Sequence, residues 1–256
     1  MELKVMSFNM LYGGYEGGVN ELSNRKSRIL EVIRREQPDI IGCQEVLHTT
    51  QRWLEKELVD EYAVVGCGRG ENCKGEGVPI LYRKKRLAML KFDTVWLSET
   101  PNEPGSRLMD VGQSPCPRLA HQIQLRCVES KTPVRVLNTH LDCGNTEARR
   151  RELEILKGYV GKVSSDELFI MTGDFNLRPE EDVLRDFLSD MKQMGVADVT
   201  QNVTASFHLF GQCVPAVKID YILSNGVASD AKIADDPHAD GIWYSDHYAL
   251  CARLSR

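Results

Sequence analysis

Six short polar motifs interrupt apolar stretches of the sequence, each where a run of strand-forming residues ends or begins. They supply carboxylates, amides and imidazoles, in the order Asn9, Glu45, His140, Asp174 with Asn176, Asp220, and Asp246 with His247. Polar groups at strand ends are where layered α/β proteins collect their chemistry. We therefore expect these residues, which come from distant parts of the chain, to meet at one site.

This set of donors predicts a hard divalent cation and the hydrolysis of a phosphate ester. Carboxylate and amide oxygens suit Mg²⁺ or Mn²⁺, and Mg²⁺ completes its coordination with water and substrate phosphate oxygens. His140 and His247 could stabilise charge that develops on a phosphoryl group, while an aspartate orients or deprotonates the attacking water. Phosphoester hydrolysis uses all of these groups together.

Each residue also has an ordinary structural interpretation. An Asn or Asp at a strand end commonly caps a turn or a helix, and a Glu after a strand is commonly solvated. Chance would rarely place all six motifs in this order, so the joint interpretation outweighs the separate ones.

The elements that must position these residues are strands with a few helices. Apolar runs predict strands at residues 3–9, 40–44, 62–66, 78–83, 87–97, 119–128, 134–140, 168–174, 219–223 and 248–254. Helical periodicity predicts helices at 21–36, 51–58, 146–163 and 180–191. Many strands with a few long helices favour a single α/β domain over residues 1–256, with sheets inside and helices outside.

Composition narrows the class of protein. The chain has 256 residues, a net charge of −5 and 42% hydrophobic residues, which is typical of a soluble globular protein and not of one that holds nucleic acid by a bulk positive field. No apolar run is long enough to span a bilayer, and no signal peptide is evident, so we expect a cytoplasmic protein with no obligate protein partner. The eight cysteines lack metal-ligand spacing and are expected to be reduced.

The motifs resemble those of the endonuclease/exonuclease/phosphatase superfamily, which has the DNase I-like fold. The matching segments are residues 7–9, 38–46, 138–141, 173–176, 219–222 and 245–247. Each is short, but the ordered set covers nearly the whole chain. The resemblance implies a four-layer α/β sandwich, in which two mostly antiparallel sheets are flanked by helices and the site lies at one end. Residues 95–101 and 104–106 resemble a poorly characterised branch near the carbon-catabolite-repression deadenylases and nocturnin.

The resemblance also implies roles for individual residues. Glu45 would be the principal metal carboxylate, with Asn9 and Asp246 close to the ion or its waters. Glu76 lies where relatives carry a glutamate paired with the first catalytic histidine, here His140.

The remaining roles implied by the resemblance concern the reacting phosphate. Asp174 would position or activate the attacking water, helped by Asn176, which also contacts the phosphate. His140 and His247 would hydrogen-bond the phosphate and stabilise its developing charge. Asp220 would orient His247 and raise its basicity.

Two arginines are candidates for the substrate phosphate. Arg118 lies at the start of a predicted strand, where an arginine can also be exposed scaffolding. Arg149 begins the run Arg149–Arg151 near the start of a predicted helix, where cations oppose the helix dipole. A substrate phosphate could compensate for this, and so could neighbouring glutamates. The glycine-rich stretch 12–18 that follows Asn9 is expected to be a mobile loop beside the site.

Three functions remain open. The leading hypothesis is a Mg²⁺-dependent phosphodiesterase that acts on nucleic acid, in the manner of a 3′–5′ RNA exonuclease. The first alternative is a phosphatase or phosphodiesterase for a small or lipid-linked phosphate. The second alternative, a non-catalytic binding module, is disfavoured because Glu45, Asp174 and His247 are all present.

Overall fold

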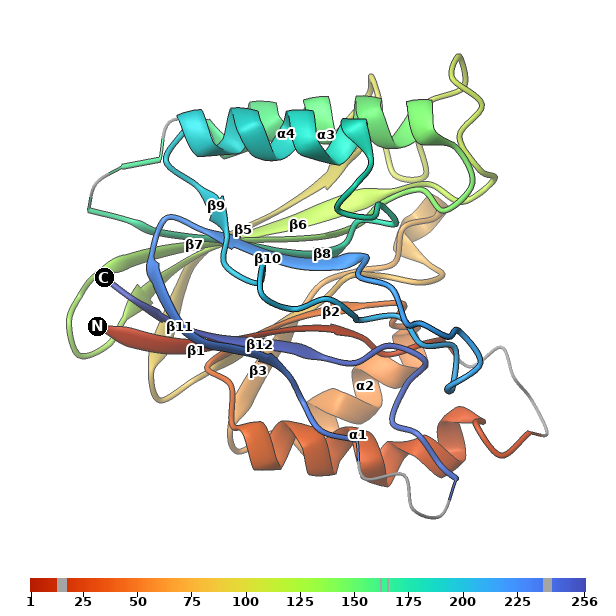
Figure 1. The fold of residues 1–256 in the computed structure, drawn as a ribbon. Coiled ribbons are helices and arrows are strands. Elements are labelled where there is room, and N and C mark those ends of the chain that lie inside the picture. Colours follow the sequence, from red (N-terminus) through yellow and green to blue (C-terminus); the bar gives the residue numbers. More distant parts are fainter. Residues whose placement is uncertain (13–17, 162, 165, 237–240) are drawn as a thin grey trace.

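Two six-stranded sheets pack face to face in the computed structural model, which describes residues 1–12, 18–161, 163–164, 166–236 and 241–256 (Figure 1). The first sheet has the strand order β11 (Val227–Ile233), β12 (Leu250–Ser255), β1 (Glu2–Asn9), β2 (Ile40–Gln44), β4 (Ile80–Arg83) and β3 (Tyr62–Val65). The second has the order β5 (Leu87–Trp96), β6 (Leu119–Cys127), β7 (Pro133–His140), β8 (Leu168–Asp174), β10 (Asp220–Ser224) and β9 (Ala197–Asp198).

Helices cover the outer face of each sheet. The helices α1 (Leu22–Glu36) and α2 (His48–Glu57) lie on the first sheet, while α3 (Thr146–Val160) and α4 (Asp182–Gln193) lie on the second (Figure 1). A short 3-10 helix, η1 (Glu71–Cys73), lies between β3 and β4. The predicted four-layer α/β sandwich is confirmed. In the part of the chain that the structure describes, no helix is both long and apolar enough to cross a membrane.

Each sheet contains one parallel pair of strands, and these two pairs carry most of the predicted site. β1 pairs with β2 in parallel through the crossover helix α1, and β7 pairs with β8 through α3, whereas the other strand pairs described are antiparallel. In the register, Asn9 lies opposite Gln44 and His140 lies opposite Asp174. Because the carboxyl ends of parallel strands meet at one edge, the four strand ends meet at one end of the sandwich.

Three apolar layers hold the sandwich together. Between the sheets, Val5, Ile40, Val136 and Ile170 are buried in one cluster. The two outer clusters lie between each sheet and its helices, with Ile29, Val32 and Ile33 of α1 beneath the first sheet and Leu153, Leu156 and Val160 of α3 against the second. The buried residues of each helix are spaced three and four apart, so they form one apolar face against the sheet. Burial of this face holds the crossover helix in place, and with it the parallel strands that the helix connects.

A buried polar network replaces the apolar core directly behind the strand ends. The Nδ2 atom of Asn138 donates to the carbonyl oxygens of Cys43 (2.7 Å) and Val78 (2.9 Å). Its Oδ1 atom accepts from Gln44 Nε2 (2.8 Å) and Thr172 Oγ1 (2.9 Å). Since side chains alternate along a strand, Asn138 and Thr172 share a face with His140 and Asp174 two residues on. The network therefore joins the two sheets next to the site.

The structure departs from the predicted elements in a few places. The strands β9 and β11 were not predicted, because β9 has two residues and β11 is an edge strand with four exposed residues. α2 begins at His48, three residues before the predicted start, and α3 ends at Val160, where Gly161 adopts a positive φ of 55°. Residues 13–17 of the predicted glycine-rich loop lie outside the described residues. The eight cysteines are free thiols, as expected.

Candidate active site

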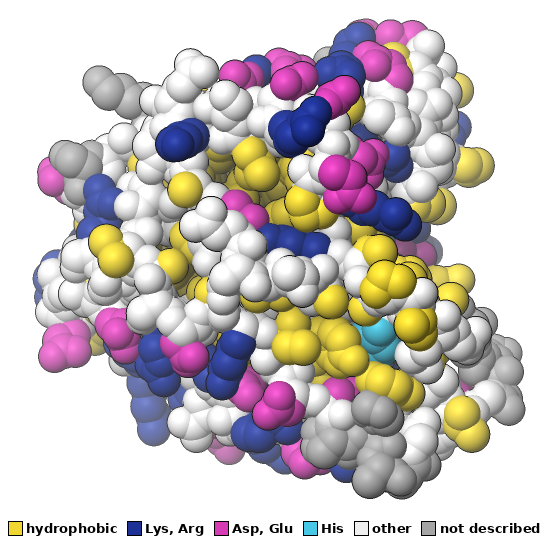
Figure 2. All heavy atoms as spheres, viewed as in Figure 1, with side chains coloured by type: hydrophobic (Ala, Val, Ile, Leu, Met, Phe, Trp, Pro, Cys, Tyr) yellow, Lys and Arg dark blue, Asp and Glu magenta, His cyan; other side chains and the backbone are white. Residues whose placement is uncertain are grey.

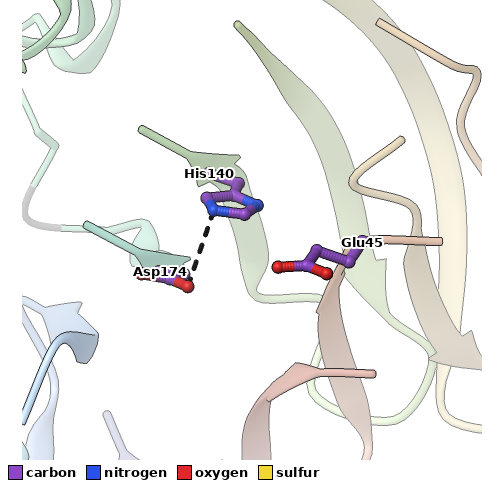
Figure 3. Close-up of side chains that lie close together, drawn as sticks. All are labelled: Glu45, His140 and Asp174. Atoms are coloured by element: carbon purple, nitrogen blue, oxygen red, sulfur yellow. Dashed lines mark ion pairs between the residues drawn. The ribbon is translucent and has the colours of Figure 1, made fainter. Parts of the chain in front are cut away.

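Glu45 and Asp174 approach each other from the two sheets, and Asn9 joins them. The Asn9 Nδ2 atom donates to Glu45 Oε1 (3.0 Å) and to Asp174 Oδ2 (3.0 Å). Asn9 Oδ1 accepts from the backbone nitrogen of Leu11 (3.0 Å), so its amide nitrogen faces the carboxylates. Glu45 has a positive φ of 58° just after β2, and it is half-buried. Figure 3 shows its carboxylate pointing toward His140 and Asp174.

The arrangement offers a place for a metal ion. Ligand atoms of Glu45, His140 and Asp174 all lie within 4.8 Å of one another, and those of Asp174, Asp220 and His247 form a second such group. A half-buried glutamate beside a buried aspartate matches the way Mg²⁺ binds, through one or two carboxylates with solvent and substrate oxygens in its other positions. The donor chemistry therefore fits the predicted cation, with Glu45 at the solvent side.

Asp174 is fully enclosed, and this makes it basic. Its Oδ2 atom lies 3.6 Å from His140 Nε2 and 3.8 Å from His247 Nε2, and Oδ1 accepts from the backbone nitrogen of Asn176 (2.9 Å). Burial, followed by the charge of Asp220, raises the pKa of Asp174 to about 7, against the opposing charge of His247. A carboxylate with a pKa near neutrality can accept a proton from water more readily than an exposed one.

His247 and Asp220 form a buried pair. His247 Nδ1 lies 2.8 Å from Asp220 Oδ2, and both side chains are at most 5% exposed. Burial disfavours the charged imidazole, but the charge and hydrogen bond of Asp220, together with Asp174 and Asp246, raise the pKa of His247 to about 10. The ring is therefore cationic at neutral pH, with its Nε2–H directed toward Asp174.

His140 is neutral, whereas His247 is cationic. Burial, then the positive charges of Arg118, Arg69 and His247, lower the pKa of His140 well below its usual value. Asn176 holds this ring, because its Nδ2 lies 3.1 Å from His140 Nε2 and donates to the carbonyl oxygen of Leu141 (3.0 Å). The two histidines flank Asp174 as one neutral and one cationic group.

Asp246 lies at the edge of this arrangement. It is 6% exposed, and burial, opposed by the charge of His247 and reinforced by that of Glu45, raises its pKa. It belongs to neither of the two ligand groups described above. The neighbouring Ser245 donates from Oγ to the carbonyl oxygen of Asn9 (2.7 Å), which ties the segment before β12 to the end of β1.

Arg118 and Glu76 line a small pocket beside the cluster, and Arg69, which was not predicted, joins them there. The polar lining of this arginine pocket consists of Glu45, Arg69, Glu76, Arg118 and His140. The described ion pair of Glu76 is with Arg69 (Nη2 to Oε2, 2.9 Å), and not with His140 as predicted. The charge on His140 is instead set by burial and by the two guanidinium groups. Glu76 thus lies at the site with a different partner.

The structure does not place Arg149 at the predicted phosphate position. Its guanidinium donates to the carbonyl oxygen of Asp142 (3.1 Å) and to Thr146 Oγ1 (2.8 Å), so it ties α3 to the segment that precedes it. Arg150 pairs with Glu147, and Arg151 pairs with exposed acidic residues. These contacts compensate for the cations at the start of the helix without a substrate.

Arg25 is a further residue that sequence analysis missed. It is 0% exposed, and its guanidinium donates to the carbonyl oxygens of Met10, Leu11, Asn20 and Tyr244. It therefore joins the segment after Asn9 to the segment before Asp246. The only sequence signal is a cation on the apolar face of α1, four residues before Ile29.

Comparisons with known proteins identify the family and the fold of the chain. The model of the Endonuclease/Exonuclease/phosphatase family matches residues 6–247. The structure of an endonuclease/exonuclease/phosphatase from Bacteroides vulgatus is 26% identical, with a TM-score of 0.89 over 100% of this chain and 99% of that chain. No curated protein sequence matches significantly.

Two further structures share the fold at lower identity. The mannosyl-6-phosphatase Bt3783 from Bacteroides thetaiotaomicron VPI-5482 is 21% identical, with a TM-score of 0.85 over 99% of this chain and 100% of that chain. The human nocturnin catalytic domain with bound sulfate is 20% identical, with a TM-score of 0.76 over 99% of this chain and 93% of that chain. The predicted resemblance is confirmed: the chain belongs to the endonuclease/exonuclease/phosphatase family and is a hydrolase of phosphoric esters.

Proposed function

We propose that the protein is a Mg²⁺-dependent phosphoesterase in which Asp174 activates water for attack on a phosphoryl group. The observation that carries this proposal is the position of Asp174 Oδ2, which lies within 4 Å of both histidines and is joined through Asn9 to Glu45. A general base, a cationic donor and a metal carboxylate thus surround one small volume. These are the functional groups that metal-dependent phosphoester hydrolysis uses.

The proposed role of each residue follows from its charge. Glu45 would hold the ion, with Asp246 contacting its waters, and Asn9 would keep the Glu45 and Asp174 carboxylates in place by donating to both. A bound Mg²⁺ would polarise the phosphoryl oxygens and neutralise their charge. Asp174 accepts the proton of the attacking water. His247, cationic through Asp220, donates from Nε2 to a phosphoryl oxygen as negative charge develops there.

His140 and Asn176 complete the phosphate site. The neutral His140 ring and the Asn176 amide form a polar wall on the other side of Asp174. Arg118 adds a fixed positive charge at the arginine pocket. His140 and Asn176 are held by hydrogen bonds to each other and to the carbonyl oxygen of Leu141, so they need little reorganisation when substrate binds.

A compact phosphate ester fits the charge of the chain better than a long nucleic acid does. Figure 2 shows Lys and Arg side chains interspersed with Asp and Glu side chains on the visible face, rather than a continuous cationic surface. The net charge is −5. A protein that neutralises many successive phosphates needs a basic track. The fold shared over the whole length with a mannosyl-6-phosphatase supports the same preference.

Hydrolysis of RNA is the second candidate, supported by the fold shared with the nocturnin catalytic domain. One experiment tests both. Purified wild type and His247→Ala are assayed with Mg²⁺ on a sugar phosphate, a nucleotide, an inositol phosphate, 5′-labelled poly(A) and duplex DNA. Release of inorganic phosphate that disappears in the variant would support the first candidate. Laddering of poly(A) that disappears in the variant would support the second. Activity that survives in the variant would contradict the assignment of the site.

A further inference from the structure

We propose that Arg69 and Arg118 form a subsite for the terminal phosphoryl group of a phosphate monoester, and that they select monoesters over diesters. The inference rests on the proposed function, because it names the substrate class of the same site. Both guanidinium groups line the arginine pocket, which they share with Glu45 and His140 of the candidate active site.

Arg118 has hydrogen-bond donors with no acceptor. It is only 3% exposed, and its Nε and Nη1 atoms have no hydrogen-bond partner among the described residues. The nearest carboxylate oxygen described, Asp142 Oδ2, is 3.9 Å from Nε, which is beyond hydrogen-bond distance. Buried donors without acceptors are costly, so an oxygen acceptor from outside the chain would stabilise this guanidinium. A phosphoryl oxygen is the acceptor that this family's chemistry brings to the pocket.

Arg69 is held in place from several sides. Its Nη2 pairs with Glu76, its backbone nitrogen donates to the carbonyl oxygen of Glu76 (2.8 Å), and its own carbonyl oxygen accepts from Trp96 Nε1 (2.7 Å). The side chain is 15% exposed, so part of it remains accessible. A guanidinium fixed in this way can bind an anion with little loss of conformational entropy.

The size of the pocket limits what can enter between the two arginines. Its volume is about 10 Å³, which is close to the space that one water molecule needs. One unsubstituted phosphoryl oxygen has that size. Monoesters and diesters both carry such an oxygen, so the selection between them depends on charge.

The charges in the pocket favour a dianion. Arg69 and Arg118 balance Glu45 and Glu76 in formal charge. A divalent cation on Glu45 would bring the sum to two positive charges. A phosphate monoester carries close to two negative charges above its second pKa of about 6, whereas a diester carries one. Charge matching thus points to a monoester, and the small pocket admits one of its unsubstituted oxygens.

The test compares two substrates with the same leaving group, 4-nitrophenyl phosphate and bis(4-nitrophenyl) phosphate, at pH 8 with Mg²⁺. We expect the wild type to prefer the monoester in kcat/KM. Arg69→Gln should lower monoester kcat/KM roughly 10- to 100-fold, the range of a charge-assisted hydrogen bond, and diester kcat/KM by less than about 3-fold. Lys74→Gln, which removes an exposed cation from the same loop, is the matched control and should leave both values unchanged.

Two further measurements separate phosphate binding from a structural role. If Arg69 only anchors Glu76, the double variant Arg69→Gln/Glu76→Gln should recover monoester activity, because the pair is then neutral; we expect the loss to persist. Calorimetric titration with inorganic phosphate should show weaker binding to Arg69→Gln than to wild type. Equal phosphate affinity, equal losses on both substrates, or recovery in the double variant would overturn the inference. A wild type inactive on both substrates would instead refute the proposed function.

Discussion

The Nδ1 atom of His247 lies 2.8 Å from Oδ2 of Asp220, and Nε2 on the opposite side of the same ring faces Asp174 at 3.8 Å. One carboxylate therefore fixes the tautomer and charge of the ring, while the other lies where the attacking water would be activated. Because Asp220 begins β10 and pairs in register with Asp174 of β8, a single strand pair sets the spacing of the two carboxylates. The geometry of the site is thus a property of the second sheet.

Replacing Asp220 with Asn should remove most of the charge that keeps His247 protonated. The pKa of His247 should fall from about 10 toward or below its usual value, because burial then dominates. We expect kcat to fall roughly 100-fold or more. NMR titration of the His247 ring measures the pKa directly. An unshifted pKa in the variant would contradict the role of Asp220.

The pair of His247 and Asp220 should make the free energy of unfolding decrease as the pH becomes alkaline. His247 has a folded pKa above its unfolded value of about 6.5, so its contribution is fully present below that pH and is lost as the pH rises through 10. Urea unfolding of wild type and Asp220→Asn should therefore show a difference in the free energy of unfolding that is large at pH 6 and shrinks by pH 10. A difference that is constant with pH would argue against this linkage.

Replacing Glu45 with Gln should weaken metal binding more than it weakens folding. Glu45 is half-buried, so its amide replacement remains hydrated. We expect the Mg²⁺ concentration for half-maximal activity to rise more than the roughly 10- to 100-fold seen when an outer-shell partner of a metal ligand is lost. Calorimetric titration with Mn²⁺ measures the same loss without turnover. The exposed Glu71→Gln is the control, and an unchanged requirement in Glu45→Gln would place the ion elsewhere.

Replacing Arg25 with Leu should destabilise the fold and the site together. The change leaves four carbonyl oxygens without their donor, each at about 1 kcal/mol or more, so we expect the free energy of unfolding to fall by at least about 3 kcal/mol. Denaturant unfolding measures this loss, and Arg34→Leu, an exposed change on the same helix, should alter stability by less than about 0.5 kcal/mol. An equal loss of stability in Arg25→Leu and Arg34→Leu would mean that Arg25 does not hold the segment after Asn9 to the segment before Asp246.

The sequence predicted the central strands well because both of their faces are buried. β2 and β8 have no exposed residue and consist of apolar runs with the bounds that were expected. β11 escaped prediction because an edge strand with the sequence Val-Ala-Ser-Asp-Ala-Lys-Ile needs no apolar run, since its backbone pairing with β12 suffices.

The candidate site was partly predictable for a related reason. Asn9, His140 and Asp174 are the last residues of their strands, and parallel strands bring their carboxyl ends together. The partner of Glu76 and the contacts of Arg149 were not predictable, because each depends on how a loop or helix packs. Arg25 contacts the carbonyl oxygen of Tyr244, 219 residues away, and no local pattern encodes such a pair.

His121 should make stability sensitive to acid. It is 0% exposed, its Nε2 accepts from the backbone nitrogen of Cys67 (3.0 Å), and burial lowers its pKa to about 4. The unfolded chain binds a proton near pH 6.5 and the folded protein does not, so stability is present above pH 6.5 and is lost between pH 6.5 and 4. At pH 4 this shift in the pKa of His121 corresponds to a loss of about 3 kcal/mol in the free energy of unfolding.

Thermal unfolding of wild type and His121→Gln between pH 4 and 8 tests this prediction. The variant should be less stable at pH 8, and its stability should fall less steeply toward pH 4. It should not become pH-independent, because His140 also has a lowered pKa. Parallel pH profiles for the two proteins would contradict the prediction.

Replacing Gly42 with Ala should separate the two sheets behind the site. A Cβ atom there would lie 1.9 Å from Thr172 Oγ1 and 2.6 Å from Asn138 Oδ1, which hydrogen-bond each other and cannot both move without losing buried contacts. We expect a loss of about 2–3 kcal/mol in the free energy of unfolding. Because Gln44 and Asn138 support the strand ends that carry Glu45 and His140, activity should also fall.

The double variant Gly42→Ala/Thr172→Ala tests whether the clash with Thr172 is the cause. Thr172→Ala removes the oxygen that the new methyl group would meet, although it also removes one buried hydrogen bond. The double variant should therefore be more stable than the sum of the two single losses predicts, by about 1 kcal/mol or more. Strict additivity in chemical unfolding would show that the glycine is needed for another reason, such as the second close approach, 2.6 Å to Asn138 Oδ1.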